Sequence, residues 1–247
     1  MLSLVLGAAS LVSPPRVALV TGATRGIGRG IAVELGRAGY TVYTLGRSTR
    51  AGGQTAERSV TEGLELTVDS AAEAVSAAGG LGIPMPCDFR DESDIERAVE
   101  VVKSAQGRLD VLVCSAYTTP PGSLRANFWT QGMTMWDACN GVGLRSVYAT
   151  CLAATPLMIE TAKADGDGAK PPLIALVSSF GGKSYTFNVA YGVGKAAVDR
   201  LARDMSYQLK KVGVATTTLY PGVVKTEGNL QMEVEGRRAR ALYECAE

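Results

Sequence analysis

Apolar runs alternate with amphipathic segments along most of the chain. Short apolar runs bounded by glycine, proline or polar residues predict six buried strands, at residues 17–20, 41–45, 83–87, 109–115, 173–177 and 214–220. Apolar residues at helical spacing predict helices at residues 27–38, 69–78, 91–105, 135–164 and 191–209. Because strands alternate with helices of ten residues or more, we expect an α/β fold: a three-layer, doubly wound parallel sheet.

Two stretches show neither the helical nor the strand periodicity of apolar residues. Residues 48–68 are polar and rich in glycine, and we expect an extended loop there. Asp69 or Ser70 would then cap the helix that follows. Residues 120–134 are expected to be irregular.

Composition favours a single domain. The 247 residues, 46% of them hydrophobic, suffice for one well-buried core, and no long linker, charge block or repeat interrupts residues 15–247. Residues 1–14 form an apolar tail that is too short to span a bilayer and lacks the basic residues of a signal peptide. We therefore predict no transmembrane segment.

Charge and residue usage exclude several functions. Lys and Arg total 25 against 24 Asp and Glu, so no net field attracts nucleic acid. The absence of histidine excludes Ser-His-Asp and Cys-His hydrolases and histidine-based metal sites, and we predict no metal. The five cysteines are scattered, which favours reduced thiols and a cytoplasmic location. The apolar tail leaves organelle or membrane association open.

A glycine-rich turn joins the first predicted strand to the first predicted helix. Gly22, Gly26 and Gly28 would let the backbone approach a pyrophosphate, whose charge the helix N-terminus favours. No acidic residue ends the second strand, where one would bind the ribose of NAD; Arg47 stands there, and Arg25 lies in the turn. Two guanidinium groups at this place predict NADP(H) as the cofactor.

A tyrosine and a lysine four residues apart form the second candidate site. On a helix Tyr191 and Lys195 share one face, and a nearby ammonium lowers the pKa of a phenol. The pair could therefore move a proton at neutral pH without histidine. Ser178 and Ser179 end the fifth predicted strand, where a hydroxyl could hydrogen-bond a carbonyl oxygen.

These motifs, in this order, resemble the short-chain dehydrogenase/reductase family, which has a Rossmann fold. The motifs that match are the turn at 21–28, Asp88, Ser179, the Tyr191/Lys195 pair and Pro-Gly-Val-Val-Lys-Thr at 221–226. The resemblance covers residues 16–226. It implies an NADP(H)-dependent oxidoreductase that interconverts a carbonyl and an alcohol, as a carbonyl reductase does.

Three further motifs resemble one group of this family, that of dehydrogenase/reductase member 1. They are Met-Trp-Asp at 135–137, Gly-Val-Gly-Leu-Arg at 141–145 and the segment from Phe187 to Lys195.

The resemblance implies catalytic roles for three residues. Tyr191 would exchange a proton with the substrate oxygen, and Lys195 would lower the pKa of that tyrosine and hold the nicotinamide ribose. Ser179 would stabilise the oxygen on which charge develops. Ser178 remains the alternative.

The resemblance also implies the cofactor contacts. Asp88 would contact the adenine, and Val224 and Thr226 would lie near the nicotinamide carboxamide. The full set is Gly22, Thr24, Arg25, Gly26, Ile27, Gly28, Arg47, Asp88, Ala116, Tyr191, Lys195, Pro221, Gly222, Val224 and Thr226.

Three features depart from the family's pattern. The Asn-Asn-Ala-Gly after the fourth strand is replaced by residues 114–117, Cys-Ser-Ala-Tyr, which alters the side-chain bonds that brace that strand. The family's helix asparagine falls on Gly143, three residues from Asn140; glycine removes the side chain but permits a helix kink. Only 25 residues follow Gly222, without an apolar run, so we expect the usual seventh strand to be missing from a truncated C-terminal part.

The expected partners are a small-molecule carbonyl or alcohol and a second copy of the chain, bound through the two long helices predicted at residues 135–164 and 191–209. Five aromatic residues could line a hydrophobic substrate site: Tyr117, Phe128, Phe180, Tyr185 and Phe187. One alternative is a truncated, non-catalytic nucleotide-binding chain. Another keeps the fold but runs a different reaction on the bound nucleotide.

Overall fold

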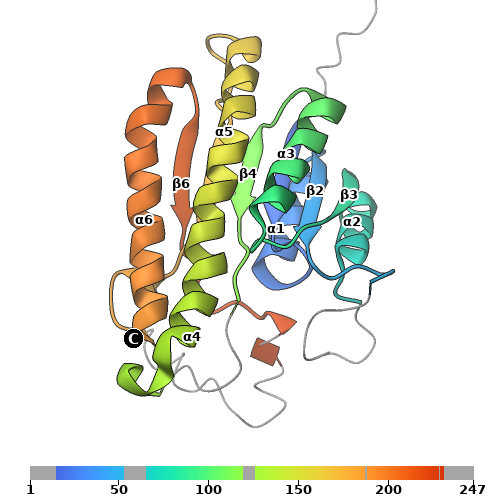
Figure 1. Cartoon of the computed structure of the whole chain (residues 1–247). Helices are drawn as coiled ribbons and strands as arrows, with labels where there is room; N and C mark the ends of the chain where they lie inside the picture. Colours follow the sequence, from blue (N-terminus) through green and yellow to red (C-terminus); the bar gives the residue numbers. More distant parts are fainter. Residues whose placement is uncertain (1–14, 53–64, 119–125, 187, 228, 231–247) are drawn as a thin grey trace, which may run out of the picture.

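A computed structural model describes residues 15–52, 65–118, 126–186, 188–227 and 229–230. Within these residues, six parallel strands form one sheet in the order β3-β2-β1-β4-β5-β6 (Figure 1). The strands are β1 (Val17–Thr21), β2 (Thr41–Gly46), β3 (Leu81–Pro86), β4 (Val111–Cys114), β5 (Leu173–Val177) and β6 (Ala215–Leu219). The expected α/β class and parallel sheet are confirmed.

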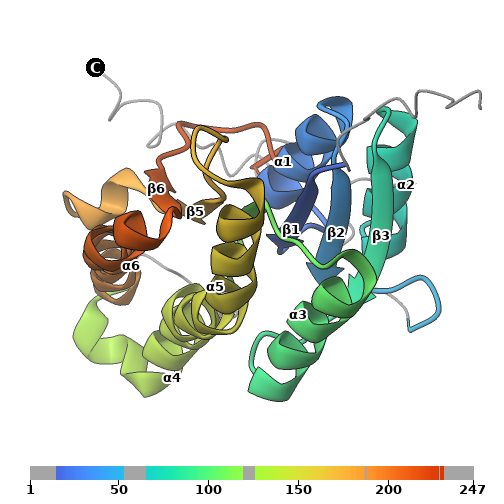
Figure 2. The ribbon, with the colours of Figure 1, turned by 90° about the horizontal axis from the view of Figure 1, so that it is seen from above.

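Helices cover both faces of the sheet. They are α1 (Gly26–Arg37), α2 (Val68–Ala77), α3 (Glu92–Gln106), α4 (Phe128–Asn140), α5 (Ser146–Asp165) and α6 (Val189–Leu209). Figure 2 shows α1 and α2 on one face and α3, α5 and α6 on the other. Two buried apolar clusters, one on each face, fill the space between the sheet and these helices. The chain therefore has the three layers of a doubly wound fold.

The segment before β5 differs most from the expectation. Helix α4 begins at Phe128, inside the stretch expected to be irregular, and Gly132 interrupts it with a φ of 64° that favours glycine. A π-helical turn, η1 (Gly141–Arg145), then joins α4 to α5. The predicted single helix at 135–164 is therefore three helical pieces in a row.

The start of α2 also differs from the expectation. The helix is capped by Thr67 rather than by Asp69 or Ser70, because the Thr67 side chain accepts from the Ser70 N–H. The apolar tail and most of the predicted loop at 48–68 lie outside the described residues, as do residues 231–247.

Strand β6 forms one edge of the sheet within the described residues. By length and composition alone, the helical run Phe128–Asp165 could cross a membrane, since its most apolar 18-residue window has a mean hydropathy of 1.3. Half of its most apolar window is buried inside the fold, as in the core helix of a soluble protein, so the run is weak support for a span.

A buried carboxylate ties β1 to the residues before β4. Asp110, 5% exposed, accepts the N–H of Val17 at 2.8 Å. The Arg108 guanidinium donates to the two Asp110 oxygens at 2.6 and 2.9 Å and reaches Asp165 at 3.0 Å. This ion-pair cluster fixes the strand ends opposite the glycine-rich turn.

Candidate active site

The glycine-rich turn between β1 and α1 forms a tight cradle. A Cβ on Gly28 would lie 2.2 Å from the Gly22 carbonyl oxygen, and a Cβ on Gly22 would lie 2.8 Å from the Ala116 Cα. Gly22 and Gly26 have φ of 67° and 57°. Glycine is therefore required here both by space and by backbone conformation.

An anionic group already sits on this cradle. The Gly26 N–H donates to the Glu227 Oε2 atom at 2.8 Å. The carboxylate marks the place where a helix N-terminus binds a negative charge, and it stands where a phosphate oxygen would be held. The residues present thus fit a dinucleotide diphosphate.

The segment after β6 lies beside the turn. A Cβ on Gly26 would meet the Thr226 methyl at 3.4 Å, and Val224 shares a shallow hollow with Gly26 and Ile27. Pro221 and Gly222 begin this segment. The structure therefore places Val224 and Thr226 of the 221–226 motif beside the glycine-rich turn, as expected if both segments bind one cofactor.

Two arginines gather at the carboxyl ends of β1 and β2. Burial lowers the pKa of Arg25; the Glu227 carboxylate opposes this shift, and the Arg47 guanidinium adds to it. Arg47 is exposed, and no carboxylate among the described residues forms an ion pair with it. Thr24 packs against Gly46, since a Cβ there would lie 2.6 Å from its methyl. Two positive charges therefore lie together at this edge.

Asp88 follows β3, at the next strand end. Its carboxylate accepts the N–H of Arg90 at 3.1 Å and lies 3.5 Å from the Arg90 Nε. Strand β3 ends at Pro86, one residue before the predicted end at Cys87, so Asp88 lies two residues beyond the strand.

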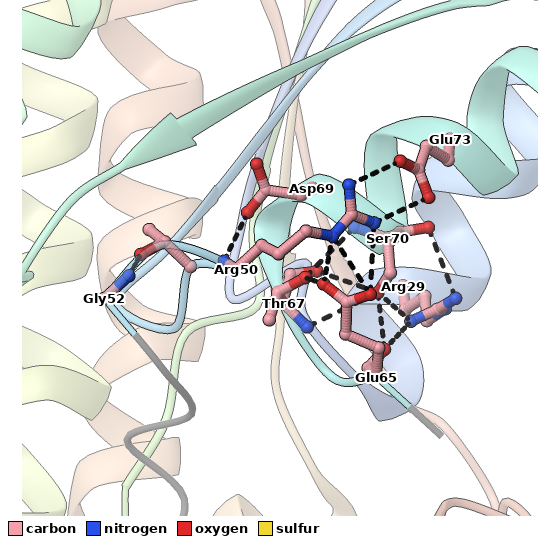
Figure 3. Close-up of polar contacts among 9 residues, drawn as sticks. Arg29, Arg50, Gly52, Glu65, Thr67, Asp69, Ser70 and Glu73 are labelled. Atoms are coloured by element: carbon pink, nitrogen blue, oxygen red, sulfur yellow. Dashed lines mark hydrogen bonds and ion pairs between the residues drawn. The ribbon is translucent and has the colours of Figure 1, made fainter. Parts of the chain in front are cut away.

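A third arginine in this region was missed by the sequence analysis. The Arg50 guanidinium lies between the carboxylates of Glu65 and Glu73, with N–O distances of 2.8 to 3.2 Å (Figure 3). Arg29 of α1 donates to Ser70 of α2 at 3.0 Å in the same cluster. Fifteen residues separate Arg50 from Glu65, so no local spacing signalled the pairing. Unlike Arg47, Arg50 is already neutralised.

Lys195 is buried beside Tyr191 on α6. The lysine is 8% exposed, and its Nζ donates to the Val177 carbonyl oxygen at 2.9 Å. Burial lowers the pKa of Lys195 to about 8, while the Asp199 carboxylate opposes this shift. The Nζ lies 5.9 Å from the centre of the Tyr191 ring.

Burial also shifts the pKa of Tyr191. It raises the pKa of this phenol, and a hydrogen bond with Ser179 opposes the shift. The expected part of Lys195, lowering this pKa, stays a prediction.

The two serines after β5 have different partners. Ser179 hydrogen-bonds Tyr191 and accepts the Gly181 N–H at 3.1 Å. Ser178 is buried and donates to the Lys195 carbonyl oxygen at 3.3 Å. The structure therefore places Ser179 against the tyrosine and uses Ser178 to hold the α6 backbone.

The departures from the family pattern have local compensations. The Thr21 Oγ1 accepts the N–H groups of Ser115 and Ala116 at 3.0 and 3.1 Å, which braces the end of β4. Gly143 lies in the π-helical turn, so the helix is distorted at this position without an asparagine. Asn140 donates to the Ala190 carbonyl oxygen at 3.3 Å and so contacts α6 from one residue before that turn.

The candidate aromatic residues that the structure describes do not line one common site. Phe128, Phe180 and Tyr185 are exposed, and Phe187 lies outside the described residues. Tyr117 alone packs into the interior, against Met135, Cys139 and Ala190.

Comparisons with known proteins agree with this geometry. The family description "short chain dehydrogenase" matches residues 16–235. The chain is 40% identical to dehydrogenase/reductase SDR family member 1 of Mus musculus over 223 residues, which cover 88% of this chain and 64% of that protein. It is also 40% identical to the Homo sapiens protein of the same name over 216 residues, which cover 86% of this chain and 61% of that protein. The chain thus spans less than two thirds of these relatives' length.

One solved structure is also similar. A metagenomic short-chain oxidoreductase in complex with NADP superposes with a TM-score of 0.68 at 29% identity, covering 84% of this chain and 82% of that one. The fold, the glycine cradle and these matches together show that the chain belongs to the short-chain dehydrogenase family of oxidoreductases.

Proposed function

We propose that this protein is an NADP(H)-dependent oxidoreductase that interconverts a carbonyl and an alcohol. The observation that carries the proposal is the meeting of Ser179, Tyr191 and Lys195 at the carboxyl ends of the strands, next to the glycine cradle. When bound, a nicotinamide cofactor supplies or accepts the hydride.

The protein's own residues would hydrogen-bond the substrate oxygen and exchange a proton with it. The Ser179 hydroxyl donates to this oxygen as negative charge develops on it. Tyr191 gives its phenolic proton to the oxygen during reduction and accepts it during oxidation. Lys195, whose ammonium lies within 6 Å of the Tyr191 ring, stabilises the phenolate that remains.

The choice of NADP(H) rests on Arg25 and Arg47. Their guanidinium groups lie together with no acidic residue at the end of β2, and the similar metagenomic enzyme was solved with NADP. A 2′-phosphate would supply the anionic partner that Arg47 lacks among the described residues.

Turnover and cofactor binding test the proposal separately. Wild-type protein should oxidise NADPH with at least one member of a panel of ketones and quinones. Tyr191→Phe should abolish turnover and keep NADPH affinity, because the ring still packs and only the proton donor is lost. NADPH binding without turnover on the whole panel would favour the non-catalytic alternative. Substantial activity in Tyr191→Phe would refute the assigned mechanism.

We also propose a homo-oligomer built on the long helices. Large apolar side chains are exposed along α4 and α5, namely Phe128, Trp129, Met133, Trp136, Tyr148 and Leu152. Such a face marks an interaction surface. Leu152→Lys should reduce the molar mass measured by light scattering, whereas the control Val101→Lys on the exposed side of α3 should not. A monomeric wild-type protein would contradict the proposal.

A further inference from the structure

The side chain of Tyr117 is enclosed between the π-helical turn and α6. Its ring packs against Met135, Cys139 and Ala190. Its hydroxyl is buried without a nitrogen or oxygen partner among the described residues, and the Cys139 thiol is the polar group that acts on it. The hydroxyl is thus poorly satisfied, and the contacts that Tyr117 makes are those of its ring.

Gly143 provides the space for this ring. A Cβ at position 143 would lie 2.8 Å from both Cδ2 and Cε2 of Tyr117, closer than real side chains approach. Gly143 is not among the glycines with positive φ, so its backbone alone would accept a side chain. The glycine is therefore explained by the ring, and a side chain at 143 and the Tyr117 ring exclude each other.

The same ring contacts both members of the proton-transfer pair. Its plane stands at 85° to that of Tyr191, with 5.8 Å between the ring centres, an edge-to-face arrangement. The Lys195 Nζ lies 5.0 Å from the centre of the Tyr117 ring, nearer than it lies to Tyr191. An aromatic face at this distance attracts an ammonium, most strongly where water is excluded.

We propose that Tyr117 is a positioning residue for Tyr191 and Lys195, and that Gly143 is needed because it admits the Tyr117 ring. The ring fixes the plane of the Tyr191 phenol and holds the Lys195 ammonium between two aromatic faces. This inference rests on the function proposed above for the pair. It links two departures from the family pattern, which lie 26 positions apart, as one packing unit.

A double-mutant cycle on stability tests the packing without any activity. Gly143→Ala should lower the urea midpoint of the wild-type protein, because the new methyl group meets the ring. In a Tyr117→Ala background the same change should leave the midpoint unchanged or raise it, because alanine favours helix more than glycine does. The control Gly141→Ala, with nothing within 4 Å of its new Cβ, should lower the midpoint in neither background. An equal fall in both backgrounds for Gly143→Ala would overturn the pairing.

The positioning role is tested by the titration of Lys195 and by kcat. Removing the ring in Tyr117→Leu should lower the pKa of Lys195, read from the pH dependence of unfolding relative to Lys195→Met. Tyr117→Phe should restore it. Asp199 and Cys139, which also act on Lys195, stay unchanged in these variants. An unmoved Lys195 pKa in Tyr117→Leu would overturn the proposal, whether or not turnover is found.

In an active enzyme the same variants separate positioning from folding. Tyr117→Leu should lower kcat at least tenfold at saturating NADPH and change the NADPH Kd little, and Tyr117→Phe should regain most of the loss. A wild-type kcat in folded Tyr117→Leu would likewise overturn the role. If wild-type protein turns over no substrate, the proposed function fails, while the stability cycle and the Lys195 titration still decide this inference.

Discussion

The carboxylate of Glu227 on the glycine cradle predicts a gain in cofactor affinity when it is removed. This side chain accepts the Gly26 N–H at 2.8 Å and attracts the Arg25 guanidinium. A dinucleotide diphosphate needs both groups. Binding must therefore displace Glu227 before the cradle can hold the phosphate, and Glu227→Ala removes this competitor.

The magnitude follows from the bond that is displaced. A hydrogen bond to a charged group contributes about 1.5–3 kcal/mol, and a carboxylate at a helix N-terminus about 0.3–1 kcal/mol. Because Glu227 is partly exposed, water screens the contact, and the smaller values apply. About 1.4 kcal/mol corresponds to a tenfold change in Kd. We expect NADPH to bind about tenfold more tightly to Glu227→Ala, with a smaller gain for Glu227→Gln, which keeps an acceptor.

Fluorescence titration or calorimetry with NADPH measures this directly. The control is Glu96→Ala, which removes one exposed carboxylate from α3, on the opposite face of the sheet from α1. The control should change Kd little, and the gain in Glu227→Ala should shrink as salt is added. An NADPH Kd in Glu227→Ala equal to or weaker than that of the wild type would show that the carboxylate does not compete with the cofactor.

Three further predictions follow from other contacts. Arg47→Ala should weaken NADPH binding by about 1.5–3 kcal/mol and leave NADH binding unchanged. The control Arg50→Ala removes a charge that is already paired, so it should change neither affinity; equal wild-type affinities for NADH and NADPH would contradict the assignment. Asp110→Ala should lower the free energy of unfolding by about 3–5 kcal/mol, because the Arg108 guanidinium loses its buried partner; Asp110→Asn should lose less in the same urea titration. Between pH 8 and 10.5 the unfolded chain keeps the Lys195 proton that the folded protein releases, so wild-type stability should rise with pH by up to about 3 kcal/mol relative to Lys195→Met. A flat difference in urea denaturation across this range would refute the lowered pKa.

The strand positions could be predicted because each central strand is buried on both faces. The run 17–20 is therefore continuously apolar, and β1 ends one residue beyond it, at Thr21. The helix at 128–140 could not be predicted in the same way. Its large apolar side chains, including Trp129, face outward, and Gly132 breaks its period, so the segment lacks the one-sided pattern of a helix packed on a sheet.

Contacts that charged groups make with residues far away in the sequence could not be predicted either. The glycine pattern predicted an anion site, and the cradle has the required geometry. That Glu227 would reach this site, 201 residues along the chain from Gly26, has no signal in local spacing. The burial of Tyr191 could not be predicted for a related reason. A helical spacing shows which charge is near a phenol, but the depth of burial, which raises the pKa of this phenol, is set by the packing around α6.

The replacement of the family's asparagine by Gly143 shows why substitutions are best interpreted in pairs. Compared with the family pattern, Gly143 is the loss of a side chain, and Tyr117 is a bulky residue at a position where glycine is usual. In the fold the two positions face each other, and the atoms removed at one are replaced by the ring added at the other. The ring thus fills the volume beside Tyr191 and Lys195, as close packing requires. Neither replacement can be interpreted alone, because the space that one leaves open is the space that the other occupies, and only the coordinates reveal this dependence.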